Sequence, residues 1–368
     1  MKSYKIITIN PGSTSTKIAC FEDEQEIFSK NVSHDASKLA EFEEISDQMD
    51  YRKETILNTL SENNVSMENV DAFVGRGGGL LSLEGGTYEI NDRMIEHARI
   101  GANGVQHPAQ LGSQLANEFC QQYGGRGFVV NPPDVDEYEL LARITGMKEI
   151  FRPSHIHALN QKETAIRHSA NLNKKYEDCN FIVCHIGGGI SIAAHKKGKM
   201  IDGTDIVEGE GPMAPTRAGA VPASPLIRLC FSGQYTEKEM LEKCTKTGGF
   251  VNHLGTSDAI EICKRADNGD TYAKLIWSAM IYQVTKSIGA MAAVLQGQVD
   301  GILLGGGMVH SVELVEQIKQ SCSFIAPVTP YPGEFEMEAM ASGAIRVLKG
   351  LEKAKQYSGE PQFTGFNF

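Results

Sequence analysis

Residues 6–17, which read IITINPGSTSTK, constrain the fold of this chain more than any other segment. An apolar run suited to a buried strand leads into the turn sequence NPG at 10–12, and the hydroxyl run STST at 13–16 ends in Lys17. A second apolar stretch follows at once, so the pattern predicts a strand, a polar glycine loop and another strand. Backbone N–H groups and hydroxyls at such a turn suit phosphate, and the lysine adds positive charge. The segment is predicted to be a phosphate-binding β-hairpin.

This hairpin differs from the common nucleotide-binding loops. The Walker A pattern G-x-x-x-x-G-K-[ST] is absent, and no helix is predicted directly after the loop. The pattern therefore argues against both the P-loop and the Rossmann folds.

Length and charge limit the remaining classes. With 368 residues the chain is too long for one ordinary core, so two domains are expected. Hydrophobic residues make up 41% and charged residues 22%, as is usual for a soluble protein. A net charge of -11 argues against nucleic-acid binding, which needs a basic surface. An anionic ligand must therefore be bound by a few local basic residues or by backbone dipoles.

Cysteines and hydropathy favour a cytoplasmic protein. The 8 cysteines form no C-x-x-C pair, which argues against a zinc or thioredoxin motif and predicts free thiols in a reducing compartment. The N-terminus begins a strand without a signal-peptide pattern. The most apolar helical stretch, near 273–295, contains Lys274 and Lys286, so a core helix is predicted there rather than a membrane span.

The hairpin pattern occurs twice. Residues 181–197, FIVCHIGGGISIAAHKK, again predict a strand, a glycine loop, a strand, a charged turn and a strand. When the two apolar runs are aligned with each other, Asn10 corresponds to either His185 or Ile186. Two similar hairpins, one early and one midway, suggest a duplicated fold with two facing lobes.

Other segments complete the predicted order of elements. A β-meander is expected over 5–32, and helical spacing of apolar residues continues from 39 to 60. The further expected elements are strands at 70–74, 128–130 and 301–304, and helices at 108–123, 270–296, from about 311, and from about 333 to 357. A loop rich in Gly and Pro is expected over 208–225 and an irregular tail over 358–368.

Three glycine-rich turns are predicted to end strands, at 10–13, 187–189 and 305–307. Glycine lets the backbone approach a ligand closely and adopts positive φ without strain. One such turn is usually structural, but three in a chain with a hydroxyl-lysine loop favour nucleotide binding.

Taken in order, the motifs resemble the acetate kinase family of the actin/hexokinase-type superfamily. The segments that carry the resemblance are ITINPGSTSTK, VGRGGGL, GVQHPAQLG, IHALNQK, CHIGGGISIAAHKKGKMID, EGPMAPTRAGAVP, LGGGMVHS and YPGEFEMEA. The resemblance covers nearly the whole length. It implies ATP-dependent, reversible phosphoryl transfer to a short-chain carboxylate, giving an acyl phosphate, and a ribonuclease H-like α/β fold in two lobes.

The resemblance implies four catalytic positions. Arg76, between glycines after a strand, is similar to the family's substrate-binding arginine, and Arg217 to the arginine that stabilises the transition state. His157 is expected to open a helix and to donate to the transferred phosphoryl. The fourth position usually holds an aspartate, where this chain has Asn131. Whether the missing charge weakens Mg²⁺ binding stays open, with Asp134 or Asp136 as a possible substitute. Each arginine has an alternative as a surface or turn residue. A metal pair formed by His155 and His157 is disfavoured because no third ligand is spaced nearby.

The resemblance also implies the ligand contacts. The positions expected to contact ATP or ADP are Asn10, Ser13, Thr14, Ser15, Lys17, His185, Gly187, Gly188, Gly189, Asp258, Gly305, Gly306, Gly307 and Met308. Mg²⁺ is expected at Asn10 and Glu336, with Glu334 and Glu338 as neighbouring alternatives to Glu336. An ordinary core role for His185, and a helix N-terminal role for the glutamates, remain open.

We expect a first lobe at about 1–155, joined by the C-terminal segment 337–368, and a second lobe at about 156–336, with the active site in the cleft between them. Length and the loops HALNQK and GGGIS favour butyrate as the acceptor over acetate, propionate or branched-chain acids. A more distant alternative is a non-catalytic actin-like nucleotide-binding protein. The resemblance implies a homodimer or larger homo-oligomer; no nucleic-acid or membrane partner is expected.

Overall fold

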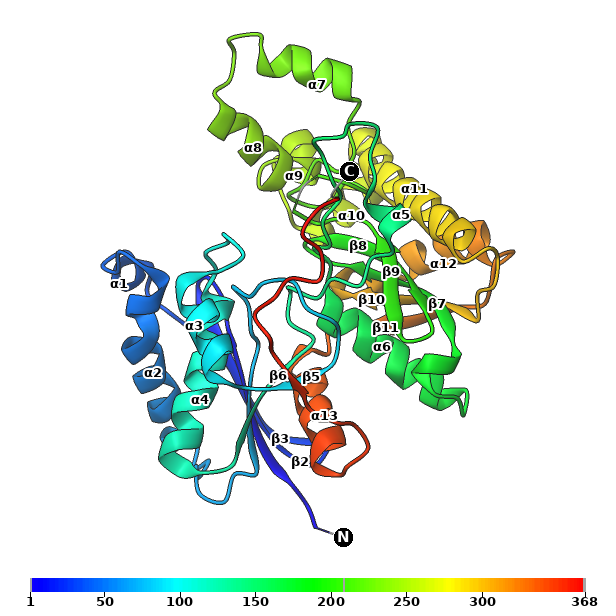
Figure 1. Ribbon diagram of the computed structural model, residues 1–368. Helices are drawn as coiled ribbons and strands as arrows, with labels where there is room; N and C mark the ends of the chain where they lie inside the picture. Colours follow the sequence, from blue (N-terminus) through cyan, green and yellow to red (C-terminus); the bar gives the residue numbers. More distant parts are fainter. Residues whose placement is uncertain (1, 208, 367–368) are drawn as a thin grey trace. The chain divides into compact units, whose positions relative to one another are not determined.

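The computed structural model describes residues 2–207 and 209–366, and the chain divides into two compact units (Figure 1). The first unit comprises Met1–Asp136 and Phe335–Phe368, and the second comprises Glu137–Glu334. The segment 137–155, expected in the first lobe, groups with the second unit, and the last helix returns to the first unit. Within the described ranges no helix is both long and apolar enough to cross a membrane.

The first unit is built on one mixed sheet of seven strands in the order β12-β5-β6-β4-β1-β2-β3. Its strands are β1 (Lys5–Pro11), β2 (Ser15–Glu22), β3 (Gln25–Ser33), β4 (Ala72–Gly75), β5 (Thr87–Glu89), β6 (Arg126–Val130) and β12 (Lys355–Gln356). Its helices are α1 (Ala36–Leu39), η1 (Ile45–Gln48), α2 (Met49–Glu62), α3 (Asp92–Ile100), η2 (Pro108–Gln110), α4 (Leu111–Tyr123) and α13 (Glu336–Leu348).

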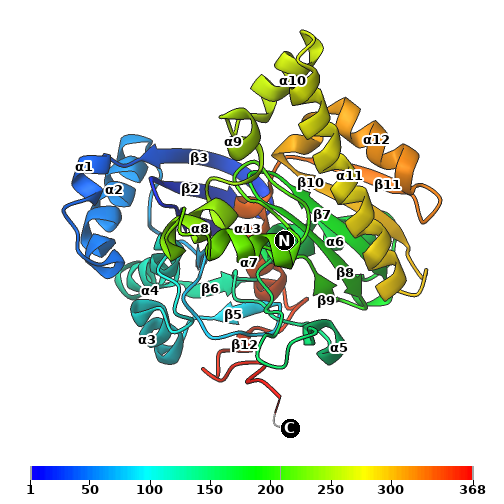
Figure 2. The same cartoon turned by 90° about the horizontal axis from the view of Figure 1, so that it is seen from above.

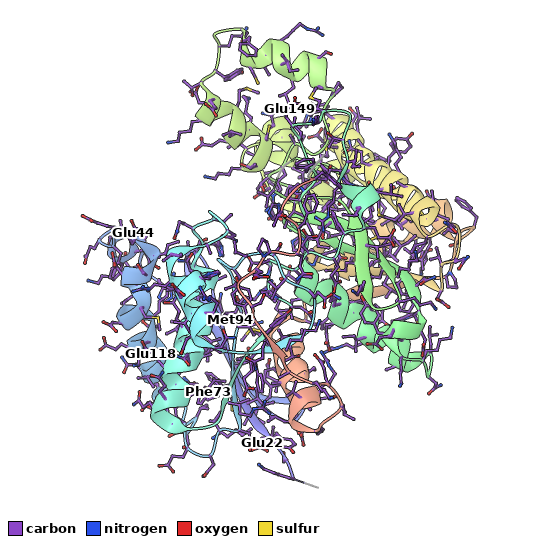
Figure 3. The ribbon with its side chains drawn as sticks, in the orientation of Figure 1. Glu22, Glu44, Phe73, Met94, Glu118 and Glu149 are labelled. Carbon is purple, nitrogen blue, oxygen red and sulfur yellow. The ribbon has the colours of Figure 1, made fainter. Side chains whose placement is uncertain are left out.

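Alternation along β1 assigns its two faces. Ile7 and Ile9 pack with Phe73 and with Phe119 of α4 in one buried cluster, because side chains two apart share a face of a strand. Helix α13 packs against β1, β4 and β6, and Figure 1 shows it across the sheet from α2 and α4. Figure 3 labels Phe73 within this layer and Glu118 on α4, where its carboxylate pairs with Lys53 of α2 at 2.6 Å.

The second unit repeats this plan with a sheet of five strands in the order β11-β10-β7-β8-β9. Its strands are β7 (Asn180–Ile186), β8 (Ile190–Lys196), β9 (Lys199–Gly203), β10 (Gly301–Gly306) and β11 (Val328–Pro332). Its helices are α5 (Leu140–Arg143), α6 (Ala158–Asn171), η3 (Tyr176–Asp178), α7 (Ala223–Cys230), α8 (Glu237–Thr245), α9 (Gly249–Leu254), α10 (Ala259–Asp267), α11 (Thr271–Val294), η4 (Gly307–His310) and α12 (Val312–Cys322).

The second sheet is covered on both faces. Ile182 and Cys184 of β7 face α11 in a large cluster that includes Trp277, whereas Phe181 and Val183 face α6. Figure 2 shows α11 and α12 together beside this sheet. The fully buried pattern of β7 explains why its sequence is a near-continuous apolar run.

The duplication predicted from the two hairpins is confirmed by the sheets. In each unit an antiparallel three-strand meander pairs through its first strand with a parallel strand: β1 with β4, and β7 with β10. Asn10 and His185 are each the sixth residue of a seven-residue first strand. The register therefore selects His185, not Ile186, as the counterpart of Asn10.

Two sequence-based boundaries were wrong. The expected helix over 39–60 is three elements, α1, η1 and α2. The last helix does not reach residue 357 but stops at Leu348, because Gly350 takes φ +71° and the amide of Leu351 bonds to the carbonyl of Arg346 at 2.8 Å. This is the hydrogen-bond pattern of a glycine-terminated helix. The short strands β5, β11 and β12 were missed because two to five residues carry little periodicity.

Candidate active site

The turn between β1 and β2 presents the hydroxyl run at the surface. The amide of Gly12 donates to the carbonyl of Ser15 at 2.7 Å, and Ser13 and Thr14 at the tip are exposed. Lys17 is exposed and pairs directly across the hairpin with Asn10. Directly opposed residues share one face of a sheet, so the lysine and the asparagine side chains lie side by side.

A buried arginine that sequence reasoning missed braces this turn. Arg52 of α2 is 0% exposed; its Nη1 donates to the carbonyl of Ser15 at 3.2 Å and to the hydroxyl of Thr16 at 2.9 Å. Its Nε and Nη2 donate to Gln48. Burial lowers the pKa of Arg52 to about 10, and the hydrogen-bond partners of its guanidinium among the described residues are Gln48, Ser15 and Thr16, none of them a carboxylate. The guanidinium of Arg52 therefore places a positive charge next to the hydroxyl loop, and this charge favours the binding of an anion there.

Arg76, Asn10 and Glu336 meet at the end of β1. The amide nitrogen Nδ2 of Asn10 donates to Oε2 of Glu336 at 2.8 Å, and Nε of Arg76 lies 3.8 Å from Oε1 of the same carboxylate. Arg76 is only 8% exposed, and its Nη1 has no hydrogen-bond partner among the described residues. A buried guanidinium nitrogen without a partner is costly, so this atom is suited to an anionic ligand.

His107, which sequence reasoning left unassigned although it lies in the motif GVQHPAQLG, belongs to the same neighbourhood. Its Nδ1 accepts from the amide of Ala109 at 3.1 Å, which requires that nitrogen to be unprotonated. Burial, with the charges of Arg76 and Arg52, lowers its pKa. The ring is therefore neutral and adds no charge to the two arginines.

Asn131 has a structural reason to be asparagine. Its φ is +38°, a left-handed conformation that Asn adopts more readily than most residues, and its Oδ1 accepts from the amide of Gly86 at 2.7 Å. Nearby in sequence, Asp134 is 9% exposed and accepts from Asn103 at 2.6 Å. Burial raises the pKa of Asp134 to about 7, although Arg76 acts in the opposite direction.

The turn between β7 and β8 holds the second group. The amide of Gly187 donates to the carbonyl of Gly189 at 3.0 Å, which closes the glycine loop. His185 is 4% exposed and stacks on His157, the residue that precedes helix α6, with ring centroids 3.8 Å apart and planes 13° apart. Nδ1 of His157 lies 2.7 Å from the hydroxyl of Ser191, and Nδ1 of His185 lies 2.8 Å from the side-chain nitrogen of Asn160.

Arg217 lies directly over this glycine loop. A Cβ at position 189 would collide with Nη1 of Arg217 and would lie 3.3 Å from Cε1 of His157, so only glycine leaves room for the guanidinium. Nη1 of Arg217 is buried and has no hydrogen-bond partner among residues 2–207 and 209–366. Burial lowers its pKa, and Asp205 acts against that shift. The second unit thus has its own arginine with a buried guanidinium nitrogen that lacks a partner among the described residues.

The third glycine turn adjoins the second. Gly305 pairs with His185 in the parallel register of β10 and β7, and Gly306, at φ +96°, packs against the backbone of Ile186. Met308 follows and is 8% exposed. Glu334, an alternative to Glu336 in the sequence, has its Oε1 3.4 Å from Nε2 of His185. Glu334 therefore belongs with the second group, and Glu336 with the first.

Asp258 and His155 have local partners. The carboxylate of Asp258 caps helix α10 by accepting from the amide of Ile260 at 2.8 Å. His155 pairs through Nδ1 with Asp205 at 2.7 Å. Within the described ranges no group of three or more His, Cys, Asp or Glu side chains is placed to hold a metal ion.

The structure thus brings the predicted residues together in two sets. Asn10, Lys17, Arg76 and Glu336 gather in the first unit, and His157, His185, Arg217 and the two glycine turns in the second. Among the residues that were missed, Asn160, Gln161 and Ser191 lie inside the quoted motifs IHALNQK and GGGIS. Arg52 carries no such signal, because only the fold brings α2 to the hairpin.

Comparison with known proteins identifies the family of the chain. Residues 138–325 match the model of the Acetokinase family. "Butyrate kinase 2" of Clostridium acetobutylicum is 47% identical over 96% of this chain and 99% of its own length, and a "probable butyrate kinase" of Clostridium botulinum (strain Alaska E43 / Type E3) is 47% identical over 96% and 100%. The crystal structure of acetate kinase from Porphyromonas gingivalis matches with a TM-score of 0.77 at 20% identity, covering 94% of this chain and 100% of that chain.

The duplicated mixed sheets and their structural neighbours define an α/β protein of the actin/hexokinase type, as the motifs predicted. Within that class the family is also clear. The chain belongs to the acetokinase family, and with it to the phosphotransferases that use a carboxyl group as acceptor.

Proposed function

We propose that this chain transfers the γ-phosphoryl group of ATP reversibly to a short-chain carboxylate, with butyrate as the preferred acceptor and butyryl phosphate as the product. The observation that carries the proposal is a pair of arginines, Arg76 and Arg217, one in each unit. Each keeps one buried guanidinium nitrogen without a partner among the described residues. Such groups suit the oxygens of carboxylate and phosphate, which a guanidinium binds in a bidentate manner.

The chemistry of a carboxylate acceptor is compatible with a site that supplies two arginines. A carboxylate has a pKa near ~4 and is already ionised at pH 7, so transfer needs no general base. The obstacle is repulsion between the carboxylate and the phosphoryl oxygens, and it is relieved by positive charge and hydrogen-bond donors. We assign the carboxylate to Arg76, and the charge that develops on the phosphoryl group to Arg217 and His157. Asn131 as an amide is compatible with this scheme, because no proton has to be removed.

We assign the nucleotide to the glycine turns. The exposed hydroxyls of Ser13 and Thr14, with Ser15 and Lys17, are suited to phosphate, and the positive charge of Arg52 supports them from behind. Gly187–Gly189 and Gly305–Met308 lie at the ends of the adjacent strands β7 and β10, which supports one continuous nucleotide surface on the second unit. The role of Asp258 in nucleotide contact stays a prediction, since its carboxylate caps a helix.

Mg²⁺ is the metal that this chemistry uses. It is commonly held by one or two side-chain oxygens, several waters and the substrate phosphates. Glu336 with Asn10 fits that requirement, because one carboxylate and one amide are adjacent; they are too few to hold the ion without phosphate. When bound, Mg²⁺ neutralises phosphate charge, and Asn10 and Glu336 are the residues that would hold it.

Two alternative functions are weighed against phosphorylation of butyrate: phosphorylation of another short-chain acid, and nucleotide binding without catalysis. Acetate, propionate or branched-chain acids differ from butyrate by methylene groups that are each worth only ~1–3 kcal/mol, so overlapping specificity is expected. A non-catalytic nucleotide-binding protein would bind ATP without transfer. The presence of Arg76, His157 and Arg217 in the expected neighbourhoods favours the enzyme.

The test is hydroxamate trapping of acyl phosphate with ATP, Mg²⁺ and unbranched and branched acids of two to six carbons. We expect product with butyrate at the highest kcat/KM. Arg76→Ala and Arg217→Ala should each lower kcat at least ~100-fold, the usual size for a lost charge-stabilising donor. Arg93→Ala and Arg228→Ala, which alter exposed arginines, serve as controls. Absence of product with every acid would refute the kinase, and preference for acetate would refute only the choice of acid.

Cytoplasmic location and assembly as a homodimer or larger homo-oligomer are part of the same proposal. The family resemblance supports both. Native mass measurement on the purified chain tests the assembly, and a mass equal to a single chain at micromolar concentration would contradict it.

A further inference from the structure

A chain of hydrogen bonds runs through the interior of the second unit and ends at His157. It passes from Tyr176 to His195 at 2.7 Å, from His195 to Gln161 at 3.0 Å, from Gln161 to Ser191 at 2.8 Å, and from Ser191 to His157 at 2.7 Å. Gln161 is 1% exposed, and Ser191 and His195 are both 0% exposed. Water does not reach these atoms, so each must satisfy its hydrogen bonds within the chain.

The orientation of the Gln161 amide follows from its neighbours. Its nitrogen Nε2 lies 3.1 Å from the backbone carbonyl of Ser191, which can only accept. The opposite atom, Oε1, therefore faces Nε2 of His195, and that ring nitrogen must carry a proton. Burial first, then the charge of Lys162, lowers the pKa of His195 well below its usual value, so the ring is neutral. Its Nδ1 accordingly accepts from the hydroxyl of Tyr176.

The hydroxyl of Ser191 has one proton and two lone pairs. The lone pairs receive Nε2–H of Gln161 at 2.8 Å and the backbone N–H of His157 at 3.4 Å. The single O–H therefore points to Nδ1 of His157, 2.7 Å away. A nitrogen that accepts this bond has no proton, so the proton of the neutral ring lies on Nε2.

We propose that Gln161 and Ser191 are positioning residues that hold His157 as the neutral tautomer with its proton on Nε2. In this form the ring is a hydrogen-bond donor toward the phosphoryl group and cannot take up a proton at Nδ1 without breaking the chain. The inference deepens the proposed function and rests on it for the identity of the accepting group. The assignment of the tautomer rests on the hydrogen bonds of Ser191 and Gln161 and does not depend on the proposed function.

The stacked histidine agrees with a neutral ring. His185 lies face to face with His157 at 3.8 Å, and two positive imidazoliums at that distance would repel each other strongly. The side-chain nitrogen of Asn160 donates to Nδ1 of His185, which places the proton of that ring on Nε2 as well. Both rings are thus held in the same tautomer by residues of helix α6 and strand β8.

The tautomer is measured directly by long-range ¹H–¹⁵N correlation on the full-length chain with ¹⁵N-labelled histidine, without nucleotide. Comparison with His157→Gln assigns the signals. We expect a pyridine-like Nδ1 and a pyrrole-like Nε2 for His157. In Ser191→Ala and Gln161→Met the ring should move toward the other tautomer or an average of the two. A pyrrole-like Nδ1 in the unaltered chain, or unchanged signals in both variants, would overturn the proposal.

Kinetics supply the second readout. Ser191→Ala and Gln161→Met should lower kcat about 10- to 100-fold, by analogy with the loss of partners that orient metal-ligating histidines, with KM changed less than about threefold. Ser191→Thr keeps the hydroxyl and should restore most of kcat. Ser169→Ala is the matched control and should leave kcat unchanged, because the hydroxyl of this buried serine of α6 bonds, among the described residues, only to the carbonyl of Ile166.

The two readouts separate this inference from the proposed function. A fall in kcat with an unchanged tautomer would refute the positioning role. If the unaltered chain makes no acyl phosphate, the proposed function fails, while the tautomer signals still decide the inference. Should Ser191→Ala fail to fold, the unaltered chain and Gln161→Met retain both tests.

Discussion

Asn10 and Glu336 lie 326 positions apart in the sequence, yet Nδ2 of the asparagine donates to the carboxylate at 2.8 Å. The contact joins the end of strand β1 to the first turn of helix α13. The same carboxylate lies 3.8 Å from the guanidinium of Arg76. One acidic side chain therefore faces both the residue assigned to the metal and the residue assigned to the carboxylate substrate.

Replacing that carboxylate tests the metal assignment. Glu336→Gln keeps the size and the contact with Asn10 but removes the charge, so we expect the Mg²⁺ concentration for half-maximal rate to rise at least ~10-fold. Glu338→Gln removes a charge from the same first turn of α13 and should leave that concentration unchanged. Titration of Mg²⁺ at fixed ATP measures both; equal values for the two variants would reject the role of Glu336.

A single methyl group tests the placement of Arg217. In Gly189→Ala the new Cβ meets the guanidinium, so Arg217 must leave the glycine loop and kcat should fall at least ~100-fold. In Gly188→Ala the same methyl meets no atom within 4 Å, and the loss should be at least tenfold smaller, about one order of magnitude or less. Thermal unfolding checks that both variants fold. Equal losses would show that the loop, and not Arg217, is what the methyl disturbs.

Substitutions at Asn131 separate its structural role, which affects stability, from the effect of a missing carboxylate charge on the Mg²⁺ requirement. Asn131→Ala loses the bond to the amide of Gly86 and leaves a side chain poorly suited to φ +38°, so the free energy of unfolding should fall by ~1–3 kcal/mol. Asn131→Asp can still accept from that amide and tolerates the left-handed conformation, so its loss should be smaller. Urea denaturation measures both. A lower Mg²⁺ requirement in Asn131→Asp would show that the missing charge matters.

Asp134 predicts a pH dependence of stability. Its pKa is raised to about 7 in the folded chain, chiefly by burial, so between pH 4 and pH 7 the folded state binds more protons than the unfolded state. The stability that Asp134 contributes is therefore lost as the pH rises through this range, by up to about 4 kcal/mol. Asp134→Asn removes the titration, so the unfolding free energy of the unaltered chain should fall relative to this variant from pH 4 to pH 8. Parallel pH profiles would contradict the prediction.

Some of the structure could be predicted because its signals are local. The first hairpin, the repeated hairpin and the long helix α11 each contain their own periodicity and turn residues, and all three were placed correctly. The duplication followed from the same local patterns. Whether Asn10 matched His185 or Ile186 stayed open, because strand register depends on pairing between segments and not on composition.

The sequence by itself determined the hairpins, the family and the residue types of the candidate site, because motifs record local backbone and chemistry. Only the tertiary structure decided which glutamate faces Asn10, that Arg52 stands behind the hydroxyl loop, and that Ser191 bonds to His157. These contacts join residues from separate elements of the sequence. Their physical basis is packing: burial removes water from the buried polar atoms, and the chain must then supply partners from wherever the fold brings them.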